Sequence, residues 1–114
     1  MKLYHYSFNT DTQLYPDFSY RVSVYEVEEK PQTYKAQHTS FKKNDIDVIK
    51  NHGYSNDGWY LNTFNPNKED VENRIKEFYI FALEKKIKRT KELMESLETS
   101  LVKAKTLPPI EEYF

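Results

Sequence analysis

Residues 68–105 lie in the longest stretch of the chain that contains neither glycine nor proline. Glu, Lys, Leu, Ala and Met dominate this stretch, and all five are good helix formers. Its apolar residues recur three and four positions apart, which is typical of an amphipathic helix. We therefore predict one long helix over 68–105, with Asn67 as the residue whose side chain caps the first N–H groups.

The predicted helix carries two apolar stripes that do not line up. The first stripe consists of Val71, Ile75, Phe78 and Ala82. The second repeats every seven residues, with Ile80, Ile87, Met94 and Leu101 at one position of the repeat and Leu83, Thr90, Leu97 and Ala104 three residues further on. At about 100° per residue, the second stripe is rotated by roughly 90–100° from the first. Because one sheet does not easily cover both stripes, we expect only the first half of the helix to pack on the chain's own sheet.

The second half of the helix then offers a coiled-coil-like seam to another helix. The expected partner is a second copy of the chain, which makes the protein a homodimer. The residues predicted to form the interface are Ile80, Leu83, Ile87, Thr90, Leu93, Met94, Leu97 and Leu101. The alternative is that this stripe packs on another element of the same chain, although the sequence contains no second long helix to serve.

Charged residues beside the seam favour an antiparallel arrangement of two such helices. A parallel pair would place Lys86 near Lys91 of its mate, which is a like-charge contact. An antiparallel pair matches Lys91 with Glu98 instead. It also matches Glu84 with Lys105. Each exposed pair contributes only roughly a few tenths of a kcal/mol, so the preference for the antiparallel arrangement is small.

Four segments before the helix have the alternating, aromatic-rich pattern of β-strands. They are Leu3–Asn9, Phe18–Glu28, Thr33–Thr39 and Trp59–Phe64. We expect the first three to form an antiparallel meander, with the aromatic face of the first strand inward and His5 toward solvent or an edge. A short helix is predicted over Asn44–Asn51, with Asn44 as its cap and Gly53 placed to end it.

These elements predict the α+β class: an antiparallel sheet of about four strands with a short helix, followed by one long C-terminal helix of coiled-coil character. A chain of 114 residues suits a single domain. We divide it into a β-rich body over 1–66, the long helix over 67–105 and an extended tail over 106–114. The tail either extends freely or docks through its apolar residues, which are Leu107, Ile110, Tyr113 and Phe114.

Aromatic residues supply much of the apolar content, with ten Tyr, seven Phe and one Trp. A Tyr ring can pack while its hydroxyl stays in water, so these rings suit either the core of a small sheet or a binding face. The residues that we consider candidates for a binding face are Tyr25, Tyr34, Trp59, Tyr60, Tyr113 and Phe114.

The net charge of −1 gives no overall electrostatic argument for binding nucleic acid or an anionic membrane. The most basic segment, Lys85–Lys91, is flanked by glutamates, which is typical of the solvated side of a helix. Nucleic-acid binding by this segment and the aromatic residues of the sheet is the alternative. No stretch approaches membrane length, and residues 1–20 do not have the pattern of a signal peptide. We expect a cytoplasmic protein.

The residue types that several kinds of catalysis need are missing or scattered. The chain has no cysteine, which excludes disulfides and thiolate chemistry, and its two glycines argue against a glycine loop for phosphate. The three histidines, His5, His38 and His52, do not have the spacing of metal ligands. We therefore expect no enzyme activity, no cofactor and no metal, and we assign no catalytic residues.

The run Tyr20–Val27 (YRVSVYEV), the pair Gly58–Trp59 and the Lys/Glu-rich helical end follow one another along the chain. In this style of sequence the chain resembles small, uncharacterised accessory proteins carried by phages and mobile elements of low-GC Gram-positive bacteria. The resemblance implies a protein that binds and blocks a bacterial defence system, in the manner of inhibitors of CRISPR effectors. Sequestration of a signalling nucleotide is the alternative that the same resemblance implies.

Overall fold

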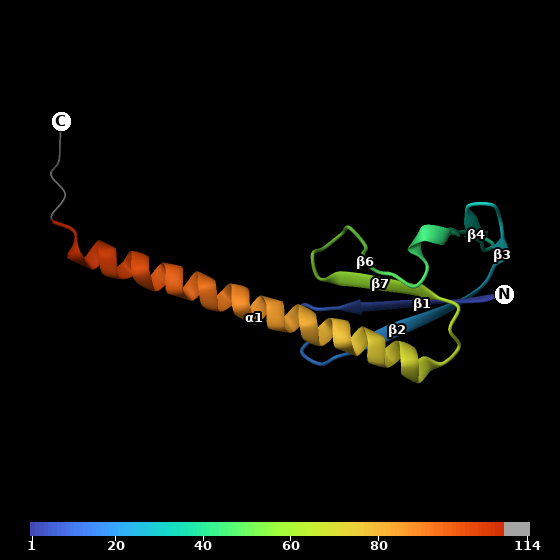
Figure 1. Cartoon of the computed structure of the whole chain (residues 1–114), viewed down its shortest axis with the longest axis horizontal. Helices are drawn as coiled ribbons and strands as arrows, with labels where there is room; N and C mark the ends of the chain where they lie inside the picture. The colour runs from blue at the N-terminus through green and yellow to red at the C-terminus, as the bar shows by residue number, and fades with distance from the viewer. Residues whose placement is uncertain (109–114) are drawn as a thin grey trace, which may run out of the picture. The chain divides into compact units, whose positions relative to one another are not determined.

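The computed structural model describes residues 1–108 and has the predicted α+β architecture (Figure 1). Its strands are β1 (Lys2–Asn9), β2 (Tyr20–Glu26), β3 (Glu28–Glu29), β4 (Thr33–Lys35), β5 (Ser40–Lys42), β6 (Ile49–Asn51) and β7 (Gly58–Thr63). A short 3₁₀ helix, η1 (Lys43–Asp45), precedes β6, and the long helix α1 (Lys68–Thr106) follows β7. The chain divides into two compact units, Met1–Tyr79 and Ile80–Phe114, and α1 contributes to both.

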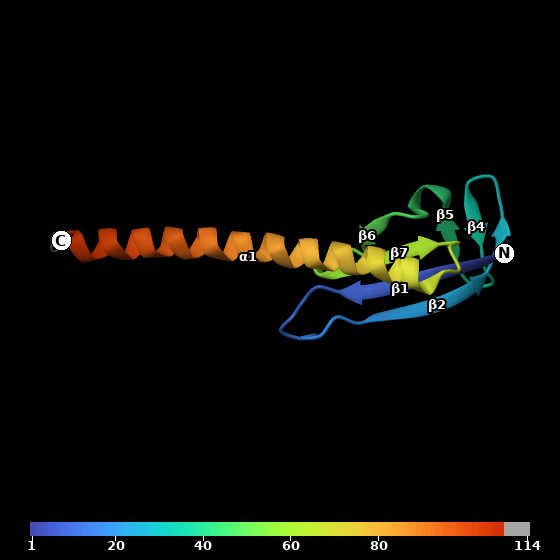
Figure 2. The same ribbon diagram turned by 60° about the horizontal axis from the view of Figure 1, so that its bottom comes forward.

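β1 lies in the middle of the larger sheet, whose strand order is β2-β1-β7-β6 (Figure 2). Each strand is antiparallel to its neighbours, and Tyr6 of β1 lies opposite Val22 of β2 and Leu61 of β7. The smaller sheet has the order β3-β4-β5. The predicted meander is therefore correct only for its first two strands, because after Val27 the chain leaves the larger sheet to build the smaller one.

The first core of the unit Met1–Tyr79 forms between the larger sheet and the first turns of α1. Tyr6, Phe8 and Leu61 contribute from the sheet, and Val71 and Ile75 contribute from the helix. Burying side chains of this size stabilises a fold by about 1.5–3 kcal/mol each. The predicted packing of the first apolar stripe on the chain's own sheet is thus confirmed for Val71, Ile75 and Phe78.

A second core lies on the opposite face of β1, since successive side chains of a strand point to opposite faces. Its buried members are Leu3, Val27 and Ala36. The prediction that His5 points to solvent or an edge is wrong, since β1 lies between two other strands. His5 lies on this second face and is half-buried, because Phe41 of the smaller sheet packs with its ring centroid 6.4 Å from that of His5.

The short helix predicted over Asn44–Asn51 does not form. The backbone of Asp47 takes a φ of 60°, and a left-handed residue interrupts a right-handed helix. The Asp47 N–H donates to the Asn62 carbonyl at 2.7 Å, and its carboxylate accepts from the Thr63 hydroxyl at 2.6 Å. These bonds tie the segment to β7, so that the next residues form the edge strand β6.

The start of α1 agrees with the sequence prediction. The side-chain oxygen of Asn67 accepts hydrogen bonds from the N–H groups of Glu69, at 3.1 Å, and Asp70, at 3.3 Å. Such a cap satisfies donors that have no partner inside the helix. The helix ends at Thr106, one residue beyond the predicted end.

Candidate functional site

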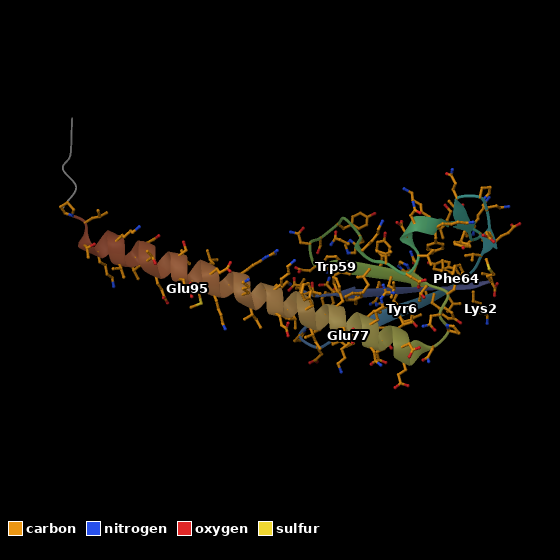
Figure 3. All side chains as sticks on the ribbon, in the orientation of Figure 1. Lys2, Tyr6, Trp59, Phe64, Glu77 and Glu95 are labelled. Atoms are coloured by element: carbon orange, nitrogen blue, oxygen red, sulfur yellow. The ribbon has the colours of Figure 1, made fainter. Side chains whose placement is uncertain are left out.

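The seam on α1 is the first candidate site. Every described residue from Ile87 to Pro108 is exposed, and Figure 3 shows the side chains around Glu95 extending outward from the helix. Six of the predicted seam residues are large hydrophobic side chains with exposed fractions between 46% and 59%, namely Ile80, Ile87, Leu93, Met94, Leu97 and Leu101. The seam is therefore an apolar surface that the described part of the chain leaves largely in water.

The two other seam residues fit the same surface. Leu83 is half-buried, and Thr90 is exposed. The Thr90 hydroxyl donates a hydrogen bond to the backbone carbonyl of Lys86 at 2.8 Å. The polar member of the seam therefore satisfies its donor within its own helix, so a partner that covers the seam need not supply an acceptor for it.

The aromatic candidates of the larger sheet's second face form a cluster with His5. The ring centroids of Tyr60 and Tyr25 lie 5.7 Å and 6.5 Å from that of His5. Tyr34, like Tyr25, packs against the second core, but its ring lies edge-on against Phe64 with a centroid distance of 4.8 Å. Of these three tyrosines, Tyr25 and Tyr60 are the two whose rings contact His5.

Trp59 lies on the other face of the larger sheet, the face that carries Tyr6, and both residues are labelled in Figure 3. Its ring packs edge-on against Phe78 of α1 at a centroid distance of 4.8 Å, and its Nε1–H donates to the Thr10 hydroxyl at 3.3 Å. The indole therefore helps to hold the first core. The remaining candidates, Tyr113 and Phe114, lie outside the described residues.

His5 is a residue whose role the sequence did not reveal. Its Nδ1 lies 2.6 Å from the side-chain oxygen of Asn62, which is buried. With that oxygen as acceptor, Nδ1 carries the proton and Nε2 of the neutral ring is left as an acceptor. The signal in the sequence is the position of the two residues opposite each other on β1 and β7, which can be read only once the strands are paired.

A shallow hollow of about 340 Å³ lies at one end of the larger sheet, and its polar lining includes Ser7, Ser19, Arg21 and His52. Guanidinium and hydroxyl groups are suited to a small anion. The Nδ1 atom of His52, however, accepts the N–H of Tyr54 at 3.0 Å, so this nitrogen is already occupied in holding the loop.

The pKa values of Tyr6 and Lys50 are shifted, and both shifts have structural causes. Burial in the first core raises the pKa of Tyr6, and Tyr20 raises it further. A hydrogen bond from its ammonium to Asp45, at 2.5 Å, raises the pKa of Lys50. Within residues 1–108, no group of three or more His, Asp or Glu side chains is placed to hold a metal ion.

The fold and these surfaces define an α+β protein with a long, partly unpacked helix. Comparison of the chain with protein-family models, with curated proteins and with solved structures found no match. No helix in the described part of the chain combines the length and the apolar character needed to cross a membrane. A function must therefore be argued from the chain's own surfaces.

Proposed function

We propose that this chain is a non-enzymatic, protein-binding protein that associates with a second copy of itself through the seam on α1. The observation that carries the proposal is the exposure of six large hydrophobic side chains at helical spacing on one unit. Contiguous apolar surface in water is typical of interaction sites. Helices also depend on packing of an apolar face for most of their stability, so a partner supplies contacts that the described residues do not.

A second copy suits this seam because the repeat of seven residues continues from Ile80 to Ala104. A sustained repeat of this kind lets two helices wind around each other with the apolar residues of each inserted between those of the other. Each Leu or Ile that becomes fully buried contributes about 1.5–3 kcal/mol. Several such residues together offset the entropy that association costs.

The molar mass in solution tests this association. The chain has a mass of 13.8 kDa, and we expect light scattering to give at least twice that mass. Leu97→Asp places a charge in the seam and should lower the mass by breaking the helix pair. Ser96→Asp is the matched control, because it adds the same charge one residue away, at a position outside the seam. Equal masses for the two variants would contradict the proposal.

The proposal extends to the role of the assembled protein, which is inhibition of a bacterial defence system in the cytoplasm of the host. The resemblance of the sequence to accessory proteins of phages and mobile elements supports this role. Expression of the chain in a host that carries such a system should raise the plaque count of a sensitive phage. Leu97→Asp should lose the effect and Ser96→Asp should keep it. If neither the unmodified chain nor Ser96→Asp raises the plaque count, the inhibitory role is contradicted, while the proposal of protein binding still stands on the molar masses.

Nucleic-acid binding has less support. Base stacking needs aromatic faces that are free, whereas Tyr34 is covered by Phe64 and Trp59 by Phe78. A binding assay at increasing salt concentration separates the two functions, because contacts to phosphate weaken steeply with salt. Tight binding of single-stranded DNA or RNA with a steep salt dependence would favour this alternative.

A further inference from the structure

The outer edge of β2 is unpaired among the described residues, since β2 ends the strand order of the larger sheet. β2 is seven residues long, contains neither proline nor lysine and pairs with β1 without a bulge. Soluble proteins commonly use short strands, proline, lysine or bulges to keep such an edge from pairing. The side chains of Val22 and Val24 are 38% and 55% exposed. This edge is therefore open to another strand.

The hydrogen bonds of β1 reveal which backbone groups of β2 point to the outer edge. The Val27 N–H donates to the Met1 carbonyl at 2.9 Å, which makes these two residues a hydrogen-bonded pair. Such pairs alternate along an antiparallel ladder, so Ser23 is bonded to His5 across the strands. The residues of β2 with even numbers, Val22 among them, must then turn their N–H and C=O groups outward.

A bond on the other side of β1 supports the same alternation. The Thr10 N–H donates to the carbonyl of Asp57, the residue just before β7, at 2.8 Å. Even-numbered residues of β1 therefore bond toward β7, and odd-numbered residues bond toward β2. The outward groups of β2 are those of Tyr20, Val22, Val24 and Glu26.

The centre of β2 is symmetric about Ser23, with Val22 on one side and Val24 on the other. We propose that the occupant of this edge is β2 of a second copy, paired antiparallel about a two-fold axis at Ser23. In this register Val22 of each copy lies opposite Val24 of the other. Both valines have outward backbone groups, so they form a hydrogen-bonded pair and their exposed side chains become covered on one face.

The other residues of β2 also meet suitable partners in this register. Tyr20 lies opposite Glu26, and its phenol can donate to the carboxylate. Arg21 lies opposite Tyr25, where a guanidinium can pack on an aromatic ring. No like charges lie directly opposite each other. A register shifted by two residues in either direction leaves residues at the ends of β2 without a partner from β2.

This surface goes beyond the proposed function, because it lies in the unit Met1–Tyr79 and the seam lies in the other. Each surface pairs with the same surface of a second copy. A chain that carries two such self-pairing surfaces forms an open row or a closed ring of even number when both are used. We therefore expect the unmodified chain to form assemblies larger than a dimer at high concentration.

Four variants separate the two surfaces by molar mass. Leu97→Asp removes the seam and should leave a dimer held by β2. Adding Val24→Pro should give a monomer, because proline removes an outward N–H without removing a bond to β1. Adding Val24→Thr instead keeps that N–H and the branched side chain, and should leave the dimer intact. If the proline variant does not fold, Val24→Lys replaces it. Val24 is exposed, so the lysine variant should fold, and it should also be a monomer.

Amide hydrogen exchange in the Leu97→Asp variant gives a second, residue-level reading. The amides of Val22 and Val24 should exchange more slowly as the protein concentration rises, because pairing covers them. The amide of Ser23 is bonded to β1 in either state and serves as the internal control. A Leu97→Asp variant that stays monomeric at all concentrations would overturn the proposal. A dimer that survives both Val24→Pro and Val24→Lys would overturn it too.

Discussion

The ring of His52 lies directly over Gly58, and a Cβ atom built on Gly58 would come within 1.6 Å of the Nε2 atom of His52. The other ring nitrogen, Nδ1, accepts the N–H of Tyr54 at 3.0 Å. Gly58 does not have a positive φ, in contrast to Gly53. The close approach of the imidazole, not the backbone conformation, is therefore what favours glycine at the start of β7.

We predict that Gly58→Ala displaces the His52 ring and breaks its bond to Tyr54, with only a small loss of stability. His52 is exposed and can turn away, so the free energy of unfolding should fall by less than about 1 kcal/mol. Urea unfolding measures this, and NMR of the imidazole reports the displacement. In a His52→Ala background the same substitution should have no cost. A loss of several kcal/mol there would mean that the strand itself rejects the side chain.

The hydrogen bond between His5 and Asn62 predicts a larger effect. His5→Phe keeps an aromatic ring between Tyr25 and Tyr60 but leaves the buried Asn62 amide without its partner. A buried polar group left unpaired costs roughly 1–3 kcal/mol, which urea unfolding would detect. His5→Phe combined with Asn62→Leu removes both polar groups and should recover part of the loss. Equal stability of His5→Phe and the unmodified chain would show that the hydrogen bond contributes nothing.

The raised pKa of Tyr6 predicts how stability depends on alkaline pH. Burial is the main cause of the shift, so the folded chain holds the phenolic proton more tightly than the unfolded chain, whose pKa is 10.0. This contribution is complete below pH 10.0 and is lost as the pH rises from there through the folded pKa. Tyr6→Phe should reduce the alkaline fall in the free energy of unfolding. Tyr54→Phe, at a residue that is 93% exposed, should not.

The helix α1 could be predicted from the sequence because its determinants are local. Propensity, an Asn67 cap and the absence of glycine and proline act within a few residues of one another. Its first stripe was also readable, since Val71 and Ile75 face one side of the helix. The seven-residue repeat of the seam could also be recognised in the sequence. Whether two copies pair through it could not, because that depends on a second chain.

The segment Asn44–Asn51 shows why other elements could not be predicted. Asn44 and the aspartates around it have the appearance of a helix start, and the spacing of Ile46 and Ile49 suggested one apolar face. In the structure Ile46 packs against the second core and Ile49 against the first. The two isoleucines serve opposite faces of the larger sheet, and that sheet exists only through strand pairings between distant parts of the chain. The half-buried position of His5 has the same origin.

The direction of the helix pair can be read from cysteine cross-linking, because the chain contains no cysteine of its own. In a parallel pair each seam residue meets its own copy, so Leu97→Cys alone would cross-link efficiently. In the antiparallel pair that matches Lys91 with Glu98, Leu97 meets Met94 instead. We expect a mixture of Leu97→Cys and Met94→Cys chains to form the mixed disulfide faster than either forms its own.

A third cysteine experiment, with Leu97→Cys and Ile87→Cys chains, distinguishes two antiparallel alignments that differ by one repeat of seven residues. The alignment that covers the whole seam, from Ile80 to Ala104, brings Leu97 opposite Ile87 and leaves like charges near each other. The alignment that matches Lys91 with Glu98 leaves Ile80 without a seam residue opposite it. A mixture of Leu97→Cys and Ile87→Cys chains that cross-links fastest would mean that apolar burial outweighs the flanking charges, which contribute only roughly a few tenths of a kcal/mol each. Rapid cross-linking of Leu97→Cys with itself would exclude both antiparallel alignments.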